Sequence, residues 1–379
     1  MATVVAGYPS LHLTPMTLPL RPELEGLVPY GAPQLDVEAR LNVNENPYAP
    51  PPSVVDAIAQ AVHHAAQGLN RYPDRDFVAL RRDLAEYLLR ESHVDPLTFD
   101  NIWAANGSNE VMLHLHQAFG GPGRTTLSFA PTYSMYPEYA RDTVTTYVEL
   151  PRQDDFSISV PHAIAAIEQH APSLVLLASP NNPTGTALPL AATLEICAAA
   201  ATVPGGCIVV VDEAYAEFRH SGVPSAVTLL PDTPNLAVSR TMSKAFALAG
   251  GRLGYLAAST AIVDALRLVR LPYHLSAVTQ ATARAALAHS RELQAQVAEI
   301  RAERDATVAW LKSEGFTVAD TDANFVLFGP FANREKVFEG LLERGVLIRV
   351  VGPEGWLRVS IGTAEEMALF RAALLEVRE

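Results

Sequence analysis

One lysine of this chain stands in a segment whose residue types suit covalent chemistry on an aldehyde. Ser243 precedes Lys244, and small residues separate the lysine from Arg252. A lysine amine can form a Schiff base with a carbonyl group. A hydroxyl and a guanidinium can together bind a phosphate. The segment therefore predicts a pyridoxal-phosphate site, in which Lys244 holds the aldehyde while Ser243 and Arg252 hold the phosphate.

A second group of polar residues follows the apolar run Ile208 to Val211. Asp212 could reach the pyridine nitrogen of such a cofactor and keep it protonated, so that the ring accepts electrons from a substrate carbanion. Tyr215 could hydrogen-bond the phenolic oxygen of the cofactor. Each residue also has an ordinary alternative, because an acid at a strand end often caps the next helix and a single tyrosine is often a packing residue.

Two loops could complete this site. Ser179 to Gly185 holds two prolines and a glycine, which predicts a rigid loop that presents Asn182 to the ring, although a plain turn fits the same composition. Gly107-Ser108-Asn109 lies between a predicted strand and a predicted helix. Backbone N–H groups at such a helix start can bind a phosphate, and glycine allows close approach. A turn of this kind is weak evidence when it stands alone.

The elements that must position these residues alternate between short apolar runs and helical patterns. The predicted strands are Ile102 to Ala105, Leu174 to Ala178, Cys207 to Val211 and Leu236 to Ser239. The predicted helices include one from Pro52, Phe77 to Arg90, Val111 to Phe119 and Leu190 to Ala201. This alternation predicts a mostly parallel sheet covered by helices on both faces. In such sheets the ligand lies beyond the carboxyl ends of the strands, where the polar groups described above fall.

We expect three parts along the chain. The proline-rich residues 1–49 should form an extended arm that contributes to a small domain and to the pocket. Residues 50–275 should form the large cofactor-binding domain. Residues 276–379 should form a smaller α+β domain, which begins with a helical tract from Thr279 to Leu311 and continues with short strands, one of them from Val346 to Arg349.

Composition limits the possible partners. The formal net charge is -13, which argues against nucleic acid, because binding phosphates requires basic surface. Any anionic substrate must then be bound by a local basic pocket. Cys197 and Cys207 show no metal-binding spacing, so no metal is expected. We find no signal-peptide pattern and no apolar run long enough for a membrane span, and we expect a soluble cytoplasmic protein with no membrane partner.

Several segments together resemble one family of enzymes. Ser179 to Gly185, Asp212 to Tyr215 and Ser243 to Arg252 resemble the fold-type-I pyridoxal-phosphate aminotransferases. From about Arg21 onward the chain is similar to the histidinol-phosphate branch of the class II aminotransferases, on the segments Val28-Pro29-Tyr30, Leu41 to Pro47, Arg71 to Asp74, Pro131 to Tyr136 and Leu357-Arg358-Val359. The resemblance implies an α/β fold with a large, mostly parallel sheet and a smaller α+β domain.

The resemblance also implies roles for the residues of the cofactor site. Lys244 would bond pyridoxal 5'-phosphate and then move a proton as general base. Asp212 would pair with the ring nitrogen, Asn182 and Tyr215 would contact the phenolic oxygen, and Tyr133 would stack on the ring. The residues implied for the phosphate are Gly107, Ser108, Asn109, Thr241, Ser243, Arg252 and, from the second subunit of a homodimer with shared active sites, Tyr72.

For the substrate, the resemblance implies that Arg358 binds a carboxylate through two parallel hydrogen bonds. Arg349 is a second candidate for anion recognition, with a surface salt bridge as its alternative. Tyr30 and Asn46 would line the other side of the pocket. The interval between Arg349 and Arg358 is short, which predicts a tight loop between them.

The implied reaction is a ping-pong transamination that interconverts L-histidinol phosphate and 2-oxoglutarate with imidazole-acetol phosphate and L-glutamate, in histidine biosynthesis. Three alternatives stay open at this point: an aromatic amino acid (phenylalanine) aminotransferase, a pyridoxal-phosphate decarboxylase acting on a phosphorylated amino acid, and a ligand-sensing regulator on the same fold. The regulator would usually carry a DNA-binding extension, and residues 1–40 are short and poor in basic residues.

Overall fold

The computed structural model describes residues 19–29, 31–94 and 97–378 of the chain. The chain divides into two compact units, Met1–Pro33 and Gln34–Glu379. The described part of the first unit contains one short 3-10 helix, η1 (Pro22–Leu24). Every other helix and strand named below belongs to the second unit.

Within the described residues, the main sheet has seven strands in the order β2-β8-β7-β6-β5-β3-β4. Their bounds are β2 (Ile102–Ala105), β3 (Thr125–Ala130), β4 (Thr146–Pro151), β5 (Leu174–Ala178), β6 (Ile208–Asp212), β7 (Leu236–Thr241) and β8 (Gly254–Ala258). β8 is antiparallel to both of its neighbours, β2 and β7. The other neighbouring pairs are parallel. All strands except β8 therefore end at the same edge of the sheet.

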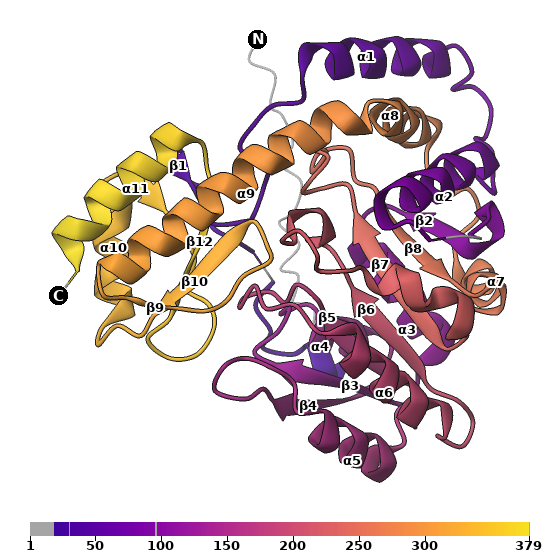
Figure 1. Ribbon diagram of the computed structural model, residues 1–379. Coiled ribbons are helices and arrows are strands. Elements are labelled where there is room, and N and C mark those ends of the chain that lie inside the picture. The colour runs from indigo at the N-terminus through magenta and orange to yellow at the C-terminus, as the bar shows by residue number, and fades with distance from the viewer. Residues whose placement is uncertain (1–18, 30, 95–96, 379) are drawn as a thin grey trace, which may run out of the picture. The chain divides into compact units, whose positions relative to one another are not determined.

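Helices cover both faces of this sheet. Every residue of β5, β7 and β8 is buried, and successive side chains of a strand point to opposite faces, so neither face is open to solvent. Helix α3 packs against β2, β7 and β8, and α6 packs against β6 (Figure 1). The helices of this part are α1 (Pro52–Ala66), α2 (Val78–Ser92), α3 (Ser108–Phe119), α4 (Tyr136–Asp142), α5 (Val160–His170), α6 (Leu190–Ala201), α7 (Thr260–Val269), η2 (Phe99–Asn101), η3 (Ala216–Phe218) and η4 (Ala226–Asp232).

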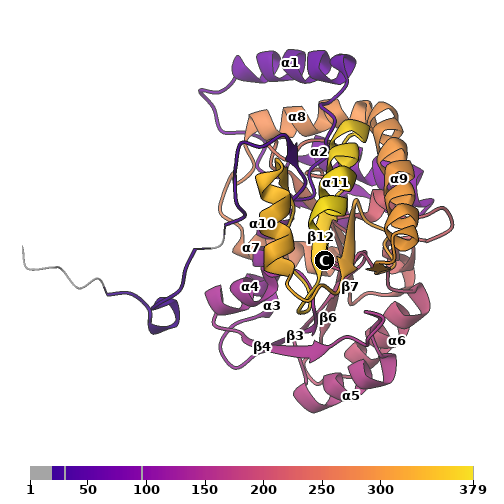
Figure 2. The same cartoon turned by 90° about the vertical axis from the view of Figure 1, so that its left-hand side faces the viewer.

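The C-terminal part has smaller sheets. An antiparallel sheet has the order β12-β10-β9, and a parallel pair joins β1 to β11. Helix α9 packs against β9 and β10, while α10 and α11 pack against β11. Helices α9, α10 and α11 lie around β12 in Figure 2. The bounds are β1 (Ala39–Arg40), β9 (Thr317–Val318), β10 (Phe325–Gly329), β11 (Val346–Leu347), β12 (Leu357–Ser360), α8 (Ala277–Ala288), α9 (Ser290–Ser313), α10 (Arg334–Glu343) and α11 (Ala364–Val377).

Local sequence explains where several of these helices begin. At α11, the Thr363 hydroxyl accepts a hydrogen bond from the Glu366 backbone N–H, and the Glu366 carboxylate accepts one from the Thr363 N–H. This reciprocal pair satisfies two donors that the first turn leaves without helical partners. Helix α3 begins instead after Gly107, whose φ of 90° favours glycine. No helix among the described residues is both long and apolar enough to cross a membrane.

One buried apolar cluster extends through both parts of the second unit, from Trp103 and Val238 in the main sheet to Phe325 and Val359 in the small one. Cys197 and Cys207 are free thiols and both are buried, so a role as small packing residues fits their positions.

The structure confirms the predicted fold class and corrects two elements. The tract predicted as one helix from Thr279 to Leu311 is two helices, because His289 leaves the helical conformation with φ −105° and ψ 19°. The predicted strand through Arg349 ends at Leu347, and Arg349 forms an isolated bridge with Arg358 instead. The proposed division at residues 49 and 275 stays a prediction.

Candidate active site

The predicted functional segments meet at one edge of the main sheet. Asp212 ends β6, and Lys244 follows β7. Gly107 follows β2, and the loop from Ser179 to Gly185 follows β5. Because these four strands run in the same direction, their carboxyl ends bring segments together that lie more than a hundred residues apart in sequence. This edge is where open α/β sheets bind ligands.

Asp212 is buried and only half satisfied. Its Oδ2 accepts a hydrogen bond of 3.0 Å from the Tyr136 hydroxyl. Its Oδ1 is buried and has no hydrogen-bond partner among the described residues. Burial raises the pKa of this carboxyl to about 6, although the bonds from Tyr136 and from the Ala214 backbone oppose the rise. A buried carboxylate oxygen without a partner is costly, so it marks a place where a donor from a ligand would be stabilised.

Lys244 carries an amine with a reduced proton affinity. Burial lowers its pKa to about 8, with the positive charges of Arg358 and Arg252 adding to the effect and Glu45 opposing it. The amine donates a 2.8 Å hydrogen bond to the backbone carbonyl of Val43. A lowered pKa increases the neutral fraction at neutral pH, and the neutral amine is the nucleophile and the base.

Tyr215 lies at the centre of a group of amides. Its hydroxyl accepts hydrogen bonds from the Nδ2 atoms of Asn44, at 3.0 Å, and Asn182, at 3.3 Å. The Oδ1 of Asn182 in turn accepts a hydrogen bond from Arg358 Nη1. The structure thus joins three predicted residues, Tyr215, Asn182 and Arg358, through direct contacts.

The two predicted substrate arginines face each other. Arg349 and Arg358 exchange two backbone hydrogen bonds, each of 3.0 Å. Directly opposed residues of an antiparallel pair point their side chains to the same face. Arg358 also donates to the carbonyl of Asn42 at 2.8 Å, and its guanidinium lies 5.1 Å from the ring centroid of Phe325. The predicted tight connection between the two arginines therefore places them side by side.

The predicted phosphate residues also gather. Arg252 lies so close to Gly107 that a Cβ on the glycine would stand 2.6 Å from Arg252 Nη2. Arg252 Nη1 lies 3.5 Å from the Ser243 hydroxyl. The Thr241 hydroxyl accepts a bond of 3.1 Å from the Ser243 N–H. Ser108 opens helix α3, whose N–H groups and dipole favour an anion.

Tyrosines surround Asn109 at the start of α3. Its Oδ1 accepts hydrogen bonds from the hydroxyls of Tyr133, at 3.2 Å, and Tyr139, at 2.8 Å. Tyr133 also packs edge-on against Tyr136, with ring centroids 5.7 Å apart. Tyr133 is therefore next to the tyrosine that bonds Asp212, which is consistent with a place beside a ring held by that aspartate.

Two predicted residues stand apart from these contacts. Tyr72 is 81% exposed and stacks on Tyr273 with ring centroids 4.4 Å apart. The side-chain Nδ2 of Asn46 is buried without a partner among the described residues. Its Oδ1 accepts a bond from the Tyr48 N–H. Tyr30 lies outside the described residues.

Inspection of the sequence missed three groups. Tyr136 bonds Asp212, Asn44 bonds Tyr215, and the carbonyl of Val43 bonds Lys244. The first two lie within the segments that carry the family resemblance, so a search for further polar residues there could have found them. The Val43 carbonyl has no signal, because every residue carries one.

Comparison with known proteins agrees with this geometry. The family model described as aminotransferase class I and II matches residues 38–374. A histidinol-phosphate aminotransferase from Thermobifida fusca is 62% identical over 94% of this chain and 95% of its own length. Histidinol-phosphate aminotransferase 3 from Burkholderia lata is 60% identical over 95% of this chain and 96% of its own length.

A solved structure agrees as well. The histidinol-phosphate aminotransferase from Sinorhizobium meliloti, in complex with pyridoxal-5'-phosphate, superposes with a TM-score of 0.81 and 25% identity over 96% of this chain and 98% of its own. The predicted family is confirmed: the chain belongs to the class I and II aminotransferases, and within them to the histidinol-phosphate aminotransferases.

Proposed function

We propose that the protein is a pyridoxal 5'-phosphate-dependent transaminase that interconverts L-histidinol phosphate and 2-oxoglutarate with imidazole-acetol phosphate and L-glutamate. The observation that carries the proposal is the pairing of a half-satisfied buried acid with a lysine of lowered pKa at one sheet edge. Asp212 Oδ1 has no partner among the described residues, and the pKa of Lys244 falls to about 8. The relatives named above support the choice of substrate.

The residues present fit the cofactor. Asp212 Oδ1 offers the acceptor that a protonated ring nitrogen needs. Gly107 leaves room against Arg252 that any side chain would fill, and Ser108 opens a helix of 12 residues whose N-terminus favours a phosphate. When bound, the cofactor withdraws electrons from the amino-acid carbon.

The chain supplies the proton transfers and the orientation. Lys244, with its pKa near neutrality, can take a proton from the substrate carbon and return it, which is the role of a general base and acid. Above its pKa of about 6, Asp212 is a carboxylate and favours a positive charge at its free oxygen. Tyr215 and Asn182 hold each other where the phenolic oxygen is proposed to lie.

Two substrates of different chemistry must use one pocket. A carboxylate enters in one half-reaction and a phosphate in the other. Arg358 and Arg349 lie on the same face of their bridge. A guanidinium can bind either anion through paired oxygens. We therefore assign anion recognition to these two arginines, with Asn46 lining the opposite side.

We further propose that the active unit is a homodimer and that Tyr72 completes the phosphate site of the second subunit. An exposed apolar group supports this: Tyr72 stacks on Tyr273, while Leu268 and Leu271 are 86% and 75% exposed. Large exposed apolar side chains that gather in one region mark interaction surfaces. Sedimentation of the wild-type protein at micromolar concentration tests the dimer, and a monomer that is fully active would exclude it.

We also propose the three-part division at residues 1–49, 50–275 and 276–379. The main sheet falls within the second part, the β12-β10-β9 sheet falls within the third, and β1 of the arm pairs with β11 of the third. A cytoplasmic location fits the two free, buried cysteines, since reducing compartments keep thiols unpaired.

The test is a single-turnover absorbance trace of the protein loaded with pyridoxal phosphate. L-histidinol phosphate, L-histidinol and L-phenylalanine are mixed with it separately, and the loss of the visible band is followed. Fast loss with histidinol phosphate alone supports both the reaction and the phosphate requirement. Equal or faster loss with phenylalanine would move the assignment to an aromatic amino acid aminotransferase.

Two variants check the assigned roles. Lys244→Ala should fold and lose steady-state transamination, because it lacks the nucleophile and the base. Arg358→Ala should slow the single turnover with glutamate severely, because the carboxylate loses its paired donors. Appreciable turnover by the first variant, or an unchanged glutamate rate in the second, would overturn the corresponding role.

A further inference from the structure

Asn44 has an unusual backbone conformation, and both polar atoms of its side chain form hydrogen bonds. It is buried and has a φ of 57°. This left-handed region favours glycine and is tolerated by asparagine better than by most residues. The segment that contains it is fixed at the site, because Asn42 and Val43 accept hydrogen bonds from Arg358 and Lys244 through their carbonyls.

The Asn44 side chain joins Ser360 to Tyr215. The backbone N–H of Asn44 donates to the Ser360 hydroxyl oxygen at 2.9 Å. The Ser360 hydroxyl in turn donates to Asn44 Oδ1 at 2.8 Å. In this arrangement the NH₂ group of the amide donates to the Tyr215 hydroxyl at 3.0 Å.

The orientation of the Asn182 amide is fixed by Arg358. The guanidinium of Arg358 can only donate, and its Nη1 contacts Asn182 Oδ1. The NH₂ group of Asn182 is therefore the atom that lies 3.3 Å from the Tyr215 hydroxyl and donates to it. Tyr215 thus receives two N–H donors, one from each amide.

We propose that Asn44 is a positioning residue: with Asn182 it occupies the acceptor positions of the Tyr215 hydroxyl and forces that O–H to donate. A phenol oxygen has one proton and accepts about two hydrogen bonds. Once both are received, the proton must point to a third group. This inference rests on the proposed function, in which that group is the phenolic oxygen of the cofactor. A donor there stabilises the anionic oxygen and lowers the pH at which the bound chromophore titrates.

Two substitutions at Asn44 test the direction of the hydrogen bond. In Asn44→Asp the carboxylate can still accept a hydrogen bond from the Ser360 hydroxyl. It cannot donate to Tyr215, so it accepts the Tyr215 O–H instead, and the cofactor loses this donor. Asn44→Gly fits the positive φ and only removes the amide. We expect the pH midpoint of the visible band to rise by about one unit in the Asp variant and by about half a unit in the Gly variant. The kcat should fall about tenfold in the Asp variant with KM within about twofold, because orientation rather than affinity is lost.

A control separates orientation from loosening of the segment. Asn324 donates to the Asn44 carbonyl at 3.0 Å and so contacts the same segment. Among the contacts of the described residues, no hydrogen bond joins Asn324 to Tyr215. Asn324→Ala should lower the melting temperature and leave the spectral midpoint unchanged. If it shifts the midpoint as far as Asn44→Gly does, or if both Asn44 variants titrate within about 0.2 units of the wild type, the proposal is wrong.

The wild-type protein distinguishes this failure from failure of the proposed function. A wild type that forms the visible band and transaminates histidinol phosphate supports the function, whatever the Asn44 variants do. Circular dichroism of the cofactor-free variants shows whether they fold. The Gly variant keeps the test valid if the buried charge of the Asp variant prevents folding.

Discussion

Asp212 and Glu213 are consecutive buried acids with opposite surroundings. Glu213 accepts hydrogen bonds from the Ala226 N–H, from the Ser225 hydroxyl and from Arg240. Asp212 accepts one bond from Tyr136 on Oδ2, and its Oδ1 has no partner among the described residues. An unpaired buried oxygen costs free energy. The acid that carries this cost is Asp212, whose Oδ1 lies where we propose that a ligand binds.

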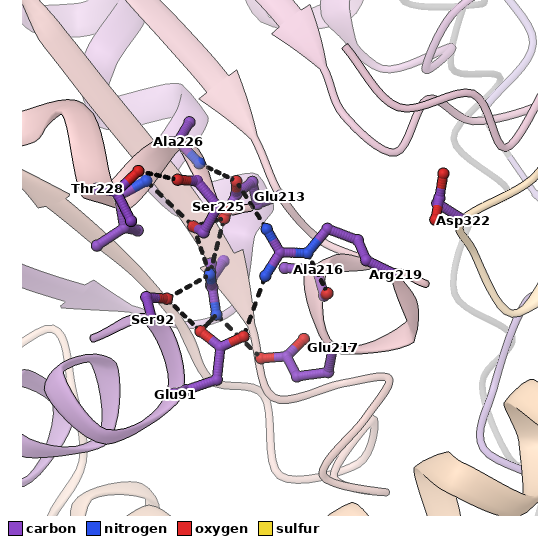
Figure 3. A network of polar contacts seen from close by, with 12 residues as sticks. Glu91, Ser92, Glu213, Ala216, Glu217, Arg219, Ser225, Ala226, Thr228 and Asp322 are labelled. Atoms are coloured by element: carbon purple, nitrogen blue, oxygen red, sulfur yellow. Dashed lines mark hydrogen bonds and ion pairs between the residues drawn. The ribbon is translucent and has the colours of Figure 1, made fainter. Parts of the chain in front are cut away.

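The contacts of Glu213 extend into a buried ionic group, the Arg240 network, which we define as Glu91, Glu213, Glu217, Arg219 and Arg240. Helix α2 supplies Glu91, and the residues after β6 supply Glu213, Glu217 and Arg219, as Figure 3 shows. Arg240, on β7, binds Glu91 and Glu213 at 2.8 Å and is 1% exposed. The network thus ties the residues that follow Asp212 to strand β7, which Lys244 follows.

The network contains three carboxylates and two guanidiniums, so it is balanced only when one acid is protonated. Burial raises the pKa of Glu217, and Glu91 adds to the rise while Arg240 opposes it. Burial also acts to raise the pKa of Glu91, but Arg240 and Arg219 outweigh it and hold this pKa below its ordinary value. Of these two acids, Glu217 is therefore the one whose neutral form the surroundings favour. Its Oε1 accepts a hydrogen bond of 3.1 Å from the Tyr87 hydroxyl.

The largest effect on activity is expected at Asp212, the acid with an unpaired oxygen. Asp212→Asn should reduce kcat/KM by about four powers of ten, or about 5 kcal/mol of transition-state stabilisation, because a neutral amide does not keep the ring nitrogen protonated. The cofactor-free variant should be as stable as the wild type or more so, since it loses a buried charge that has a single partner. Steady-state kinetics and urea unfolding measure the two quantities, and a variant that is unstable yet active would reverse the comparison.

Arg240→Met should produce the opposite pattern. It removes the shared cation and leaves Glu91 and Glu213 buried without their main partner, which we expect to cost about 3–5 kcal/mol of unfolding free energy. The chemical groups that contact the substrate are unchanged, so the fall in kcat should be smaller than that of Asp212→Asn. Urea unfolding of the cofactor-free protein measures the loss. A variant with wild-type stability would show that the network does not stabilise the sheet edge.

Part of this comparison was accessible from sequence. Asp212, Lys244 and Gly107 each follow a short apolar strand, and parallel strands bring their ends to one edge, so local patterns were enough to place them together. The Arg240 network was not accessible, because Arg240 contacts Glu91 across 149 positions. Asn44 lies within a segment that carries the family resemblance, but its contact with Tyr215, 171 positions away, was not accessible either. No local pattern specifies such pairs.

The corrected helix gives a second reason. The break at His289 occurs without a glycine or proline in its immediate neighbourhood. Helix α8 packs against α1 and α2, whereas α9 packs against β9 and β10. The change of direction therefore follows from tertiary packing, and the helix propensities of the residues do not predict it.

The pH dependence of stability should also reflect the unusual surroundings of Asp212. In the folded protein the pKa of Asp212 rises from 3.8 to about 6, so the folded state binds this proton more tightly than the unfolded state does. Stability should then fall as the pH rises through this window, by about 2–3 kcal/mol. Asp212→Asn lacks the titrating group, so the variant should gain stability relative to the wild type between pH 4 and pH 7. A difference that stays constant over this range would mean that the buried carboxyl titrates normally.

The smallest effect is expected at Glu217. Because burial and the nearby Glu91 raise the pKa of this acid and so favour its neutral form, Glu217→Gln should cost less than about 1 kcal/mol of unfolding free energy. The matched change Glu213→Gln removes a charge that Arg240 needs and should cost about 3 kcal/mol. Urea unfolding of both variants at pH 7 gives the comparison within one network and with one chemical substitution. Equal costs would mean that the surplus proton is not held by Glu217. The network would then carry a net negative charge next to Asp212 in the chain. That charge would itself favour a cationic ring nitrogen.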